Sequence, residues 1–272
     1  MKKSDLSKAI DFHRRGEYKK AEKLYLKLIK DKKQRVETIA NANANLGGLY
    51  FQFHEYDKAI LFLKKAIYIN PLHTNTLNNL ALVYKNSEKF HDSIDILKQV
   101  LKLDPHHKEA IYNIGYSYSK IESYLEAISY FEKVITMDNQ YVNAYFQLAN
   151  IYEFHFFNYT KAVDIYHQIL NLEPENVIVN FNLSQCYMAL SNYSEALHYV
   201  DITLKLNSTY EKAQYRFCEL SLLTSNFDNS YKGFDTRLTK KHKSLLSGKI
   251  WKGESLQNKT IIAIDPGKSD IL

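Results

Sequence analysis

Residues 74–107, TNTLNNLALVYKNSEKFHDSIDILKQVLKLDPHH, are followed directly by residues 108–141, KEAIYNIGYSYSKIESYLEAISYFEKVITMDNQY, and the two stretches align without a gap. Each has a small residue in the same place, Ser93 in the first and Ala127 in the second. This small position recurs along the chain at spacings of 38, 34, 34, 35, 34 and 34 residues, as Ala21, Ala59, Ser93, Ala127, Ala162, Ala196 and Ser230. So long and regular an interval indicates one repeated supersecondary unit.

Two aromatic columns follow the same period. The first column places a tyrosine four residues after an aliphatic residue, at Tyr50, Tyr84, Tyr118, Tyr152 and Tyr187. The second marks the expected turn between two helices, at Tyr18, Tyr56, Phe90, Tyr124, Tyr159, Tyr193 and Phe227. Three repeats close with a proline, at Pro71, Pro105 and Pro174. Because the residue before a proline disfavours the helical conformation, we expect helices to end near Asn70, Asp104 and Glu173.

This pattern resembles the tetratricopeptide repeat (TPR) family over residues 2–244. The resemblance implies an all-α fold, a right-handed TPR superhelix (an α-α solenoid) of seven helix-turn-helix repeats. The expected repeats are residues 2–35, 40–73, 74–107, 108–141, 142–176, 177–210 and 211–244, with four extra residues after the first. Residues 245–272 are expected to form a short non-repeat tail, in which the apolar run 260–264 predicts one short strand.

The tail carries a second motif. Trp251 begins the run WKGESLQNKT, which is followed by an apolar segment and then by DPGKSD. These residues resemble the junction between TPR repeats and a glycosyltransferase domain in certain bacterial proteins. The family pattern is W-x-G-E-x-L-x-G-K-T, a strand, then E-x-G-x-G-D, from which this chain departs at Asn258 and Ser269. The resemblance implies an acceptor-binding arm, similar to that of O-GlcNAc transferases, whose catalytic domain is missing or separate; the tail would be the remnant of that following domain.

Composition argues against several classes of partner. The 36 basic and 30 acidic residues are interspersed and give a net charge of +6, so we expect no nucleic-acid partner. No stretch approaches 18 apolar residues and the N-terminus lacks an apolar signal region, so no membrane association is predicted and a cytoplasmic location is expected. Cys186 and Cys218 are expected to be reduced, partly buried thiols.

No group of residues predicts catalysis. Three of the ten histidines, His73, His106 and His107, fall at repeat ends without a cysteine or carboxylate cluster at ligand spacing. No combination of serine, histidine and aspartate can be argued either. We therefore expect a non-enzymatic protein with no catalytic residue, no metal site and no cofactor.

A column of amides lies one residue before the aliphatic position, at Asn45, Asn79, Asn113, Gln147 and Asn182. The TPR resemblance places this face of the first helix on the concave surface, where Tyr112, Tyr116 and Phe146 are expected beside the amides. A carboxamide carries both a donor and an acceptor, so a row of them could pair with the backbone of an extended peptide. The alternative is that these amides only reflect the family consensus.

The expected function is therefore a protein–protein interaction module that binds an extended peptide segment in its concave groove. The partner protein, the process and the oligomeric state do not follow from the sequence. A second surface remains open to two interpretations. The turn at residues 154–159, FHFFNY, has one extra residue and four aromatic rings. It forms either an exposed patch for a partner or a turn whose rings fold onto the adjacent helices.

Overall fold

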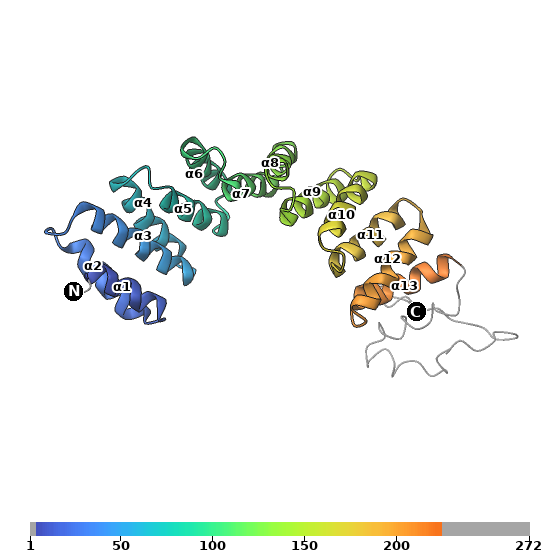
Figure 1. The fold of residues 1–272 in the computed structure, drawn as a ribbon, viewed down its shortest axis with the longest axis horizontal. Helices are drawn as coiled ribbons and strands as arrows, with labels where there is room; N and C mark the ends of the chain where they lie inside the picture. The colour runs from blue at the N-terminus through green and yellow to red at the C-terminus, as the bar shows by residue number, and fades with distance from the viewer. Residues whose placement is uncertain (1–3, 225–272) are drawn as a thin grey trace, which may run out of the picture. The chain divides into compact units, whose positions relative to one another are not determined.

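The computed structural model describes residues 4–224, and every regular element in that range is an α-helix (Figure 1). The helices are α1 Asp5–Arg14, α2 Tyr18–Lys30, α3 Val36–Gln52, α4 Tyr56–Ile69, α5 Thr74–Asn86, α6 Phe90–Leu103, α7 Lys108–Lys120, α8 Tyr124–Met137, α9 Val142–Phe154, α10 Tyr159–Leu172, α11 Val177–Ala189, α12 Tyr193–Leu206 and α13 Glu211–Leu223. The second half of the expected seventh repeat, and the tail with its expected strand, lie outside the described residues.

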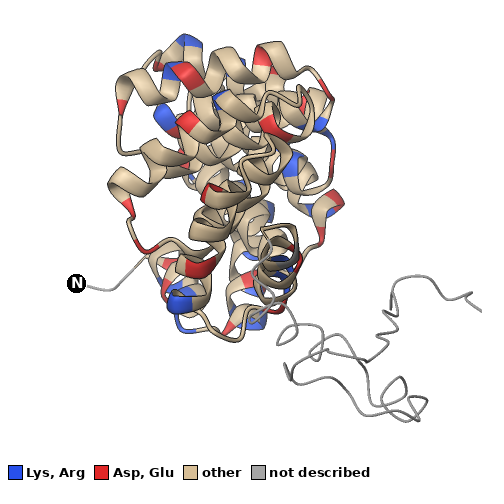
Figure 2. Cartoon of the chain, turned by 90° about the vertical axis from the view of Figure 1, so that its right-hand side faces the viewer, with Lys and Arg blue, Asp and Glu red and all other residues tan. Residues whose placement is uncertain are grey.

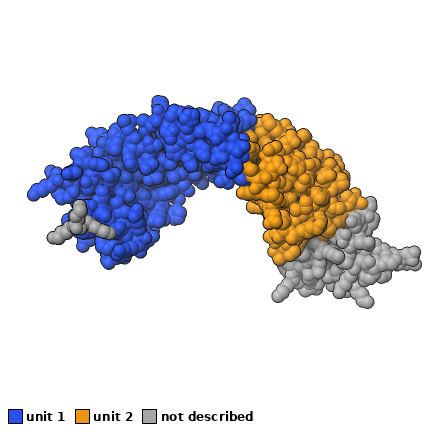
Figure 3. All heavy atoms as spheres, viewed as in Figure 1, with its two compact units in different colours: residues 1–144 blue, residues 145–272 orange. Residues whose placement is uncertain are grey.

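The chain divides into two compact units, residues 1–144 and residues 145–272, and the division falls in the first turn of α9 (Figure 3). Each unit is described by itself below. Basic and acidic residues are interspersed along the helices, as Figure 2 shows. The all-α repeat fold expected from the sequence is confirmed, whereas the division into seven repeats stays a prediction.

The proline rule places the helix ends correctly. Helices α4, α6 and α10 end at Ile69, Leu103 and Leu172, one residue before the three positions expected from the prolines. Helix α3 begins at Val36, so the four extra residues after the first repeat form its first turn. The sequence therefore set these boundaries through local backbone sterics.

The aromatic turn column marks the first residue of α2, α4, α6, α8, α10 and α12. Two residues before each aromatic, the backbone adopts a positive φ, at Gly16, His54, Glu88, Glu122, Phe157 and Ser191. This left-handed residue reverses the chain between the paired helices, and only Gly16 adopts it without steric cost. The repeats thus share one turn geometry despite different residues.

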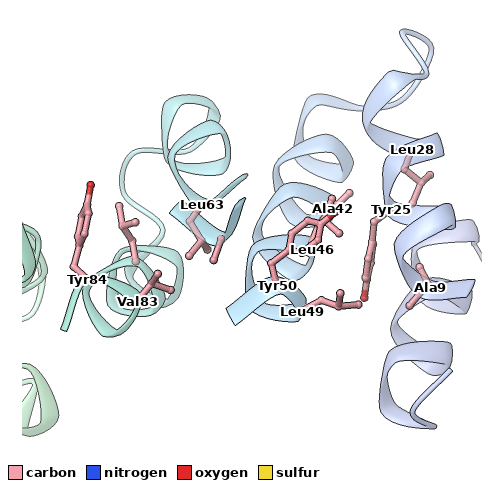
Figure 4. Close-up of a cluster of buried hydrophobic side chains, with 13 residues drawn as sticks. Ala9, Tyr25, Leu28, Ala42, Leu46, Leu49, Tyr50, Leu63, Val83 and Tyr84 are labelled. Atoms are coloured by element: carbon pink, nitrogen blue, oxygen red, sulfur yellow. The ribbon is translucent and has the colours of Figure 1, made fainter. Parts of the chain in front are cut away.

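The buried side chains lie between successive helices. In the first unit, residues of α1 to α5 form one cluster that includes the fully buried Tyr25, Leu46 and Leu63 (Figure 4). In the second unit, Phe181, Val200 and other apolar residues of α11 to α13 form a corresponding cluster. Each helix therefore buries its apolar face against its neighbours in the sequence, as a repeat array requires.

The two helices of a repeat cross closely because both carry a small residue at the crossing. A Cβ atom built on Gly47 of α3 would lie 2.6 Å from Cγ of Leu63 and 3.2 Å from the carbonyl oxygen of Ala59, both on α4. One repeat later, the Ser93 hydroxyl of α6 donates a hydrogen bond of 2.9 Å to the carbonyl of Ala81 on α5. Any larger side chain at these positions would separate the helices.

Two adjacent glycines of α3 provide a test of this crossing. Gly47→Ala forces a methyl group against Leu63, so we expect the free energy of unfolding to fall by roughly 1–3 kcal/mol. Gly48→Ala is the matched control, because a Cβ there meets nothing within 4 Å. Since alanine is the better helix former, Gly48→Ala should raise stability by roughly 0.5–1 kcal/mol. Urea unfolding of both variants measures the difference; equal effects would contradict the close crossing.

Candidate functional site

The five amides of the expected column have unequal environments. Asn79 on α5 is exposed, and no hydrogen bond of its side chain is found within residues 4–224. Gln147 on α9 is half-buried and likewise has no side-chain hydrogen bond in the described part of the chain. The Asn45 amide instead donates to the carbonyl of Asn41 in its own helix, at 2.8 Å. Asn79 and Gln147 are therefore the amides that a ligand could bind without breaking an internal bond.

Asn113 on α7 is only 8% exposed and is engaged by a lysine of the preceding repeat. Its Oδ1 accepts a hydrogen bond of 2.9 Å from Nζ of Lys85 on α5. The sequence interpretation treated this carboxamide as available to a peptide; in the structure the lysine reaches across from α5 and already bonds to it. Asn113 consequently joins α5 to α7 rather than standing free.

The same lysine lies over an aromatic ring. Lys85 Nζ is 5.4 Å from the ring centroid of Tyr116, and Lys120 Nζ is 5.2 Å from that centroid. Partial burial lowers the pKa of Lys85, and no carboxylate lies within 4 Å of its Nζ among residues 4–224. The face shared by α5 and α7 is therefore locally cationic, a feature that the column analysis missed. In the sequence, the signal for this cationic feature is Lys85, which lies two helical turns after Asn78 on the same face of α5.

Tyr112 packs more firmly than Tyr116. Its ring lies 5.7 Å from that of Phe131 on α8 and 5.3 Å from that of Tyr141, measured between centroids. These contacts fix the ring while leaving it half-buried. Tyr112 can thus offer a rigid apolar surface, and Tyr116 offers a ring that already lies near two ammonium groups.

In the second unit, one residue of the amide column, Asn182, belongs to a buried network of hydrogen bonds. Asn182 on α11 is 8% exposed, and its Nδ2 donates at 3.1 Å to the hydroxyl of Tyr166 on α10. That hydroxyl donates at 2.6 Å to Oε2 of Glu153 on α9. Phe146 contacts the Tyr166 ring edge-on, with the centroids 6.3 Å apart. Asn182 is therefore buried while Phe146 stays half-buried, and the network links three consecutive helices.

Glu153 is a buried carboxyl group, 4% exposed, that makes no ion pair with any described residue. Burial raises its pKa, and the hydrogen bond from Tyr166 lowers it only in part. Burial beside Glu153 also raises the pKa of Cys186 well above its usual range, so that its thiolate is suppressed. Cys186 and Cys218 form no disulfide with each other, and both are buried more deeply than the partly buried thiols expected from the sequence.

The exposure of the turn between α9 and α10 decides between the two interpretations of residues 154–159. Phe154, Phe156 and Phe157 are 53%, 43% and 67% exposed. The turn therefore presents its rings to solvent instead of folding them onto the helices. The Phe156 ring also contacts the column tyrosine Tyr152, at 6.0 Å between centroids.

Within residues 4–224 no three histidine, cysteine or carboxylate side chains gather in a way that could hold a metal ion. In the same range no helix is long and apolar enough to cross a membrane.

Comparison with family models gives two matches. A model described as anaphase-promoting complex, cyclosome, subunit 3 matches residues 52–134, and a model described as tetratricopeptide repeat matches residues 156–215. No curated protein matches the chain. One of the two family matches lies in each compact unit.

Solved structures give the same fold at low sequence identity. The C-terminal part of a TPR repeat-containing protein from Cytophaga hutchinsonii aligns with a TM-score of 0.76 at 15% identity, over 89% of this chain and 100% of that chain. A TPR protein from Parabacteroides merdae aligns with a TM-score of 0.64 at 17% identity, over 85% and 90% of the two chains. YrrB, described as a TPR protein with an unusual peptide-binding site, aligns with a TM-score of 0.55 at 17% identity, over 74% and 97%.

These matches support a tetratricopeptide repeat protein. Proteins built on this fold are generally non-catalytic and generally bind protein or peptide partners. The matches carry no information on the glycosyltransferase junction, whose residues lie outside the described part of the chain.

The buried carboxyl group of Glu153 should make the stability of the fold depend on pH. Because the folded state raises the pKa of Glu153 above its ordinary value of 4.5, stability is lost as pH rises from that value through the folded pKa. Glu153→Gln removes this loss, and its amide oxygen can still accept from Tyr166. The variant's stability relative to the wild type should therefore increase with pH over this window, as measured by urea unfolding at a series of pH values.

The matched control is Glu175→Gln, because Glu175 is exposed in the turn after α10. Its stability relative to the wild type should stay constant over the same pH range. A constant difference for Glu153→Gln as well would contradict a buried, destabilising carboxylate.

Proposed function

We propose that this chain is a non-enzymatic protein–protein interaction module that binds an extended peptide segment of a partner protein. In the first unit the peptide lies along the face formed by α5 and α7. The observation that carries the proposal is Asn79, whose exposed carboxamide has no hydrogen-bond partner within the described residues. An exposed amide offers a donor and an acceptor to a peptide backbone at little desolvation cost.

The aromatic residues beside it add contact area. Tyr112 and Tyr116 of α7 are half-buried, so each presents part of its ring to solvent. Tyrosine suits a peptide groove because it contributes a large contact area with little loss of side-chain freedom. In the second unit we assign Gln147 and Phe146 of α9 to the corresponding surface. Asn45, Asn113 and Asn182 complete the proposed set, but each must exchange an internal hydrogen bond for one to the ligand.

Because three of the five amides already have internal hydrogen bonds, the five would not contribute equally to the free energy of peptide binding. A hydrogen bond that replaces one to water adds a net free energy of about 0.5–1.5 kcal/mol. An amide that must first release an internal partner adds less than one that is free. Affinity in the first unit therefore rests on Asn79 and the aromatic rings more than on a uniform row of five amides.

An alternative proposal rests on the tail sequence alone. The run that begins at Trp251 favours an acceptor-binding arm of a glycosyltransferase. Reading the coding sequence downstream distinguishes the two proposals, because this alternative requires two Rossmann-like lobes in frame or in a neighbouring gene. A cytoplasmic location remains a prediction from the sequence under both.

Substitution of Asn79 tests the leading proposal. The protein is first used to select binders from a displayed library of random peptides, and the affinity of a selected peptide is measured by calorimetry. Asn79→Ala should weaken binding by about 0.5–1.5 kcal/mol, the contribution of one net hydrogen bond. Its melting temperature should not change, because the side chain is exposed and makes no internal hydrogen bond.

Asn139→Ala serves as the control, since Asn139 is also exposed but lies in the turn after α8. This variant should bind the peptide as the wild type does. Unchanged binding by Asn79→Ala would remove Asn79 from the site, and failure to select any peptide would count against the proposed function itself.

A further inference from the structure

The basic residues of this chain are concentrated in its first helix pair. Residues 1–35 contain 13 basic and 5 acidic residues, which gives them a net charge of +8. The whole chain contains 36 basic and 30 acidic residues, so residues 36–272 hold the other 23 basic and 25 acidic residues, with a net charge of −2. The balance over the whole chain therefore conceals a strongly basic end. An asymmetry of this kind is typical of proteins that contact a polyanion.

Helix α2 presents four of these basic residues on one face. They are exposed and are called the lysine face below: Lys19, Lys23, Lys27 and Lys30. Since an α-helix has 3.6 residues per turn, the four lie within an arc of about 80°. The fully buried Ala21 and Tyr25 lie on the opposite side of α2, which packs into the core of the first unit. The lysine face therefore points away from the core and into solvent.

The corresponding helices of the other repeats lack such a face. The lysine face occupies the second, sixth, tenth and thirteenth residues of α2. The same four positions of α4, α6, α8 and α12 hold one lysine each, and those of α10 hold none. These single lysines are Lys65, Lys102, Lys133 and Lys205. Because the repeats share one turn geometry, the fold does not require lysine at these positions, and the lysine face is particular to α2.

Ion pairs neutralise little of this charge. Lys27 Nζ lies 3.4 Å from a carboxylate oxygen of Asp5 on α1. Lys19, Lys23 and Lys30 form no ion pair with any residue among residues 4–224. Three of the four ammonium groups are thus available to an external anion.

The acidic residues on and beside α2 have other partners. Glu17 precedes the helix and pairs with a lysine outside the lysine face. Glu22 accepts a hydrogen bond of 2.6 Å from the hydroxyl of Tyr50, and Asp31 accepts one of 3.0 Å from the side-chain amide of Gln34. The segment after α2 then adds three more exposed basic residues, Lys32, Lys33 and Arg35. Positive charge therefore continues beyond the end of the helix.

The form of the lysine face favours a broad anionic surface. At 1.5 Å per residue, the distance along the helix from Lys19 to Lys30 is about 16 Å. The four positions include no arginine, the residue that binds phosphate groups of nucleic acids in a bidentate manner. They also include no aromatic ring on which a base could stack. Lysine is a strongly hydrated point charge, which suits the diffuse attraction of anionic lipid headgroups.

We propose that the lysine face of α2 holds this protein against a membrane surface that contains anionic lipids. The apolar side of α2 packs into the core, so the contact is made by charge and no segment of α2 enters the bilayer. We expected no membrane association from the sequence because the chain has no apolar span, but adsorption through lysines requires none. The amide column lies on the first helices of the repeats, so this proposal is independent of peptide binding.

The test measures co-sedimentation of the full chain with two kinds of vesicle. One kind is phosphatidylcholine alone, and the other is an equal mixture of phosphatidylcholine and phosphatidylserine. At low ionic strength, where surface charges are least screened, the chain should bind the mixed vesicles and not the neutral ones. Added salt should release the bound protein, because the contact depends on charge.

A triple variant removes the three unpaired charges by combining Lys19→Gln, Lys23→Gln and Lys30→Gln. A lysine near an anionic membrane surface strengthens adsorption about fivefold, so this variant should bind the mixed vesicles roughly a hundredfold more weakly. Its fold should be unaffected, since all three side chains are exposed. Circular dichroism of the variant checks that its helices are retained.

The matched control combines Lys65→Gln, Lys102→Gln and Lys133→Gln. It removes the same charge from the equivalent positions of α4, α6 and α8, where each lysine is exposed. Because the attraction of a membrane surface falls off within a Debye length, this control should weaken binding by roughly twofold or less.

Equal binding to both kinds of vesicle, no binding to the mixed vesicles, or equal losses in the two triple variants would each overturn the proposal. Binding of a labelled DNA duplex or of polyglutamate without binding to the mixed vesicles would assign the lysine face to another polyanion and would also overturn it. If the first triple variant loses its helices, its three single substitutions decide. Each should weaken vesicle binding about fivefold, and no change in any of them would overturn the proposal.

Discussion

The close crossing of the two helices within each repeat is the constraint on which the rest of this structure depends. At Gly47 there is no room for even a methyl group beside Leu63, and at Ser93 the hydroxyl is bonded to the backbone of the facing helix. A crossing this close fixes the distance and rotation between the paired helices. The same small positions recur along the chain, so the same geometry recurs, and each apolar face is buried against the next.

A fixed crossing also determines which side chains remain available to a ligand. Once each first helix has buried its apolar faces, the members of its amide column lie at different depths, from the exposed Asn79 to the buried Asn113 and Asn182. The members of this column are not equivalent, because each has different neighbours. The Asn79 side chain is exposed to solvent, Asn113 accepts a hydrogen bond from Lys85, and Asn182 donates one to Tyr166.

The sequence could predict the fold because the fold is periodic. A column of small residues, a column of aromatics and three prolines each have a local steric cause, and together they placed the helix ends to within one residue. The candidate site was less predictable. Lys85 and Asn113 are 28 residues apart, and Tyr166 and Asn182 are 16 apart, so neither pair follows from one helix alone. The exposed phenylalanines of the turn after α9 were undecided for a similar reason, since exposure depends on which helices lie near.

Glu153 in the second unit and Lys85 in the first are ionisable groups whose burial disfavours their charged forms, and their surroundings differ. Glu153 is nearly inaccessible and hydrogen-bonded to Tyr166, so its charge is disfavoured and its role is internal. Lys85 is half-buried, donates a hydrogen bond to Asn113 and lies near the Tyr116 ring, and no carboxylate pairs with it among residues 4–224. A neutral residue could fill either place with a smaller desolvation penalty.

This distinction also bears on the meaning of the amide column. If every amide were free, recognition would follow the peptide backbone and select little. Asn113 is bound to Lys85 and Asn182 to Tyr166, so these two amides hold neighbouring helices together. The Asn79 side chain is exposed and has no hydrogen bond to another described residue. The family-consensus interpretation therefore fits Asn113 and Asn182, and the proposed binding role fits Asn79.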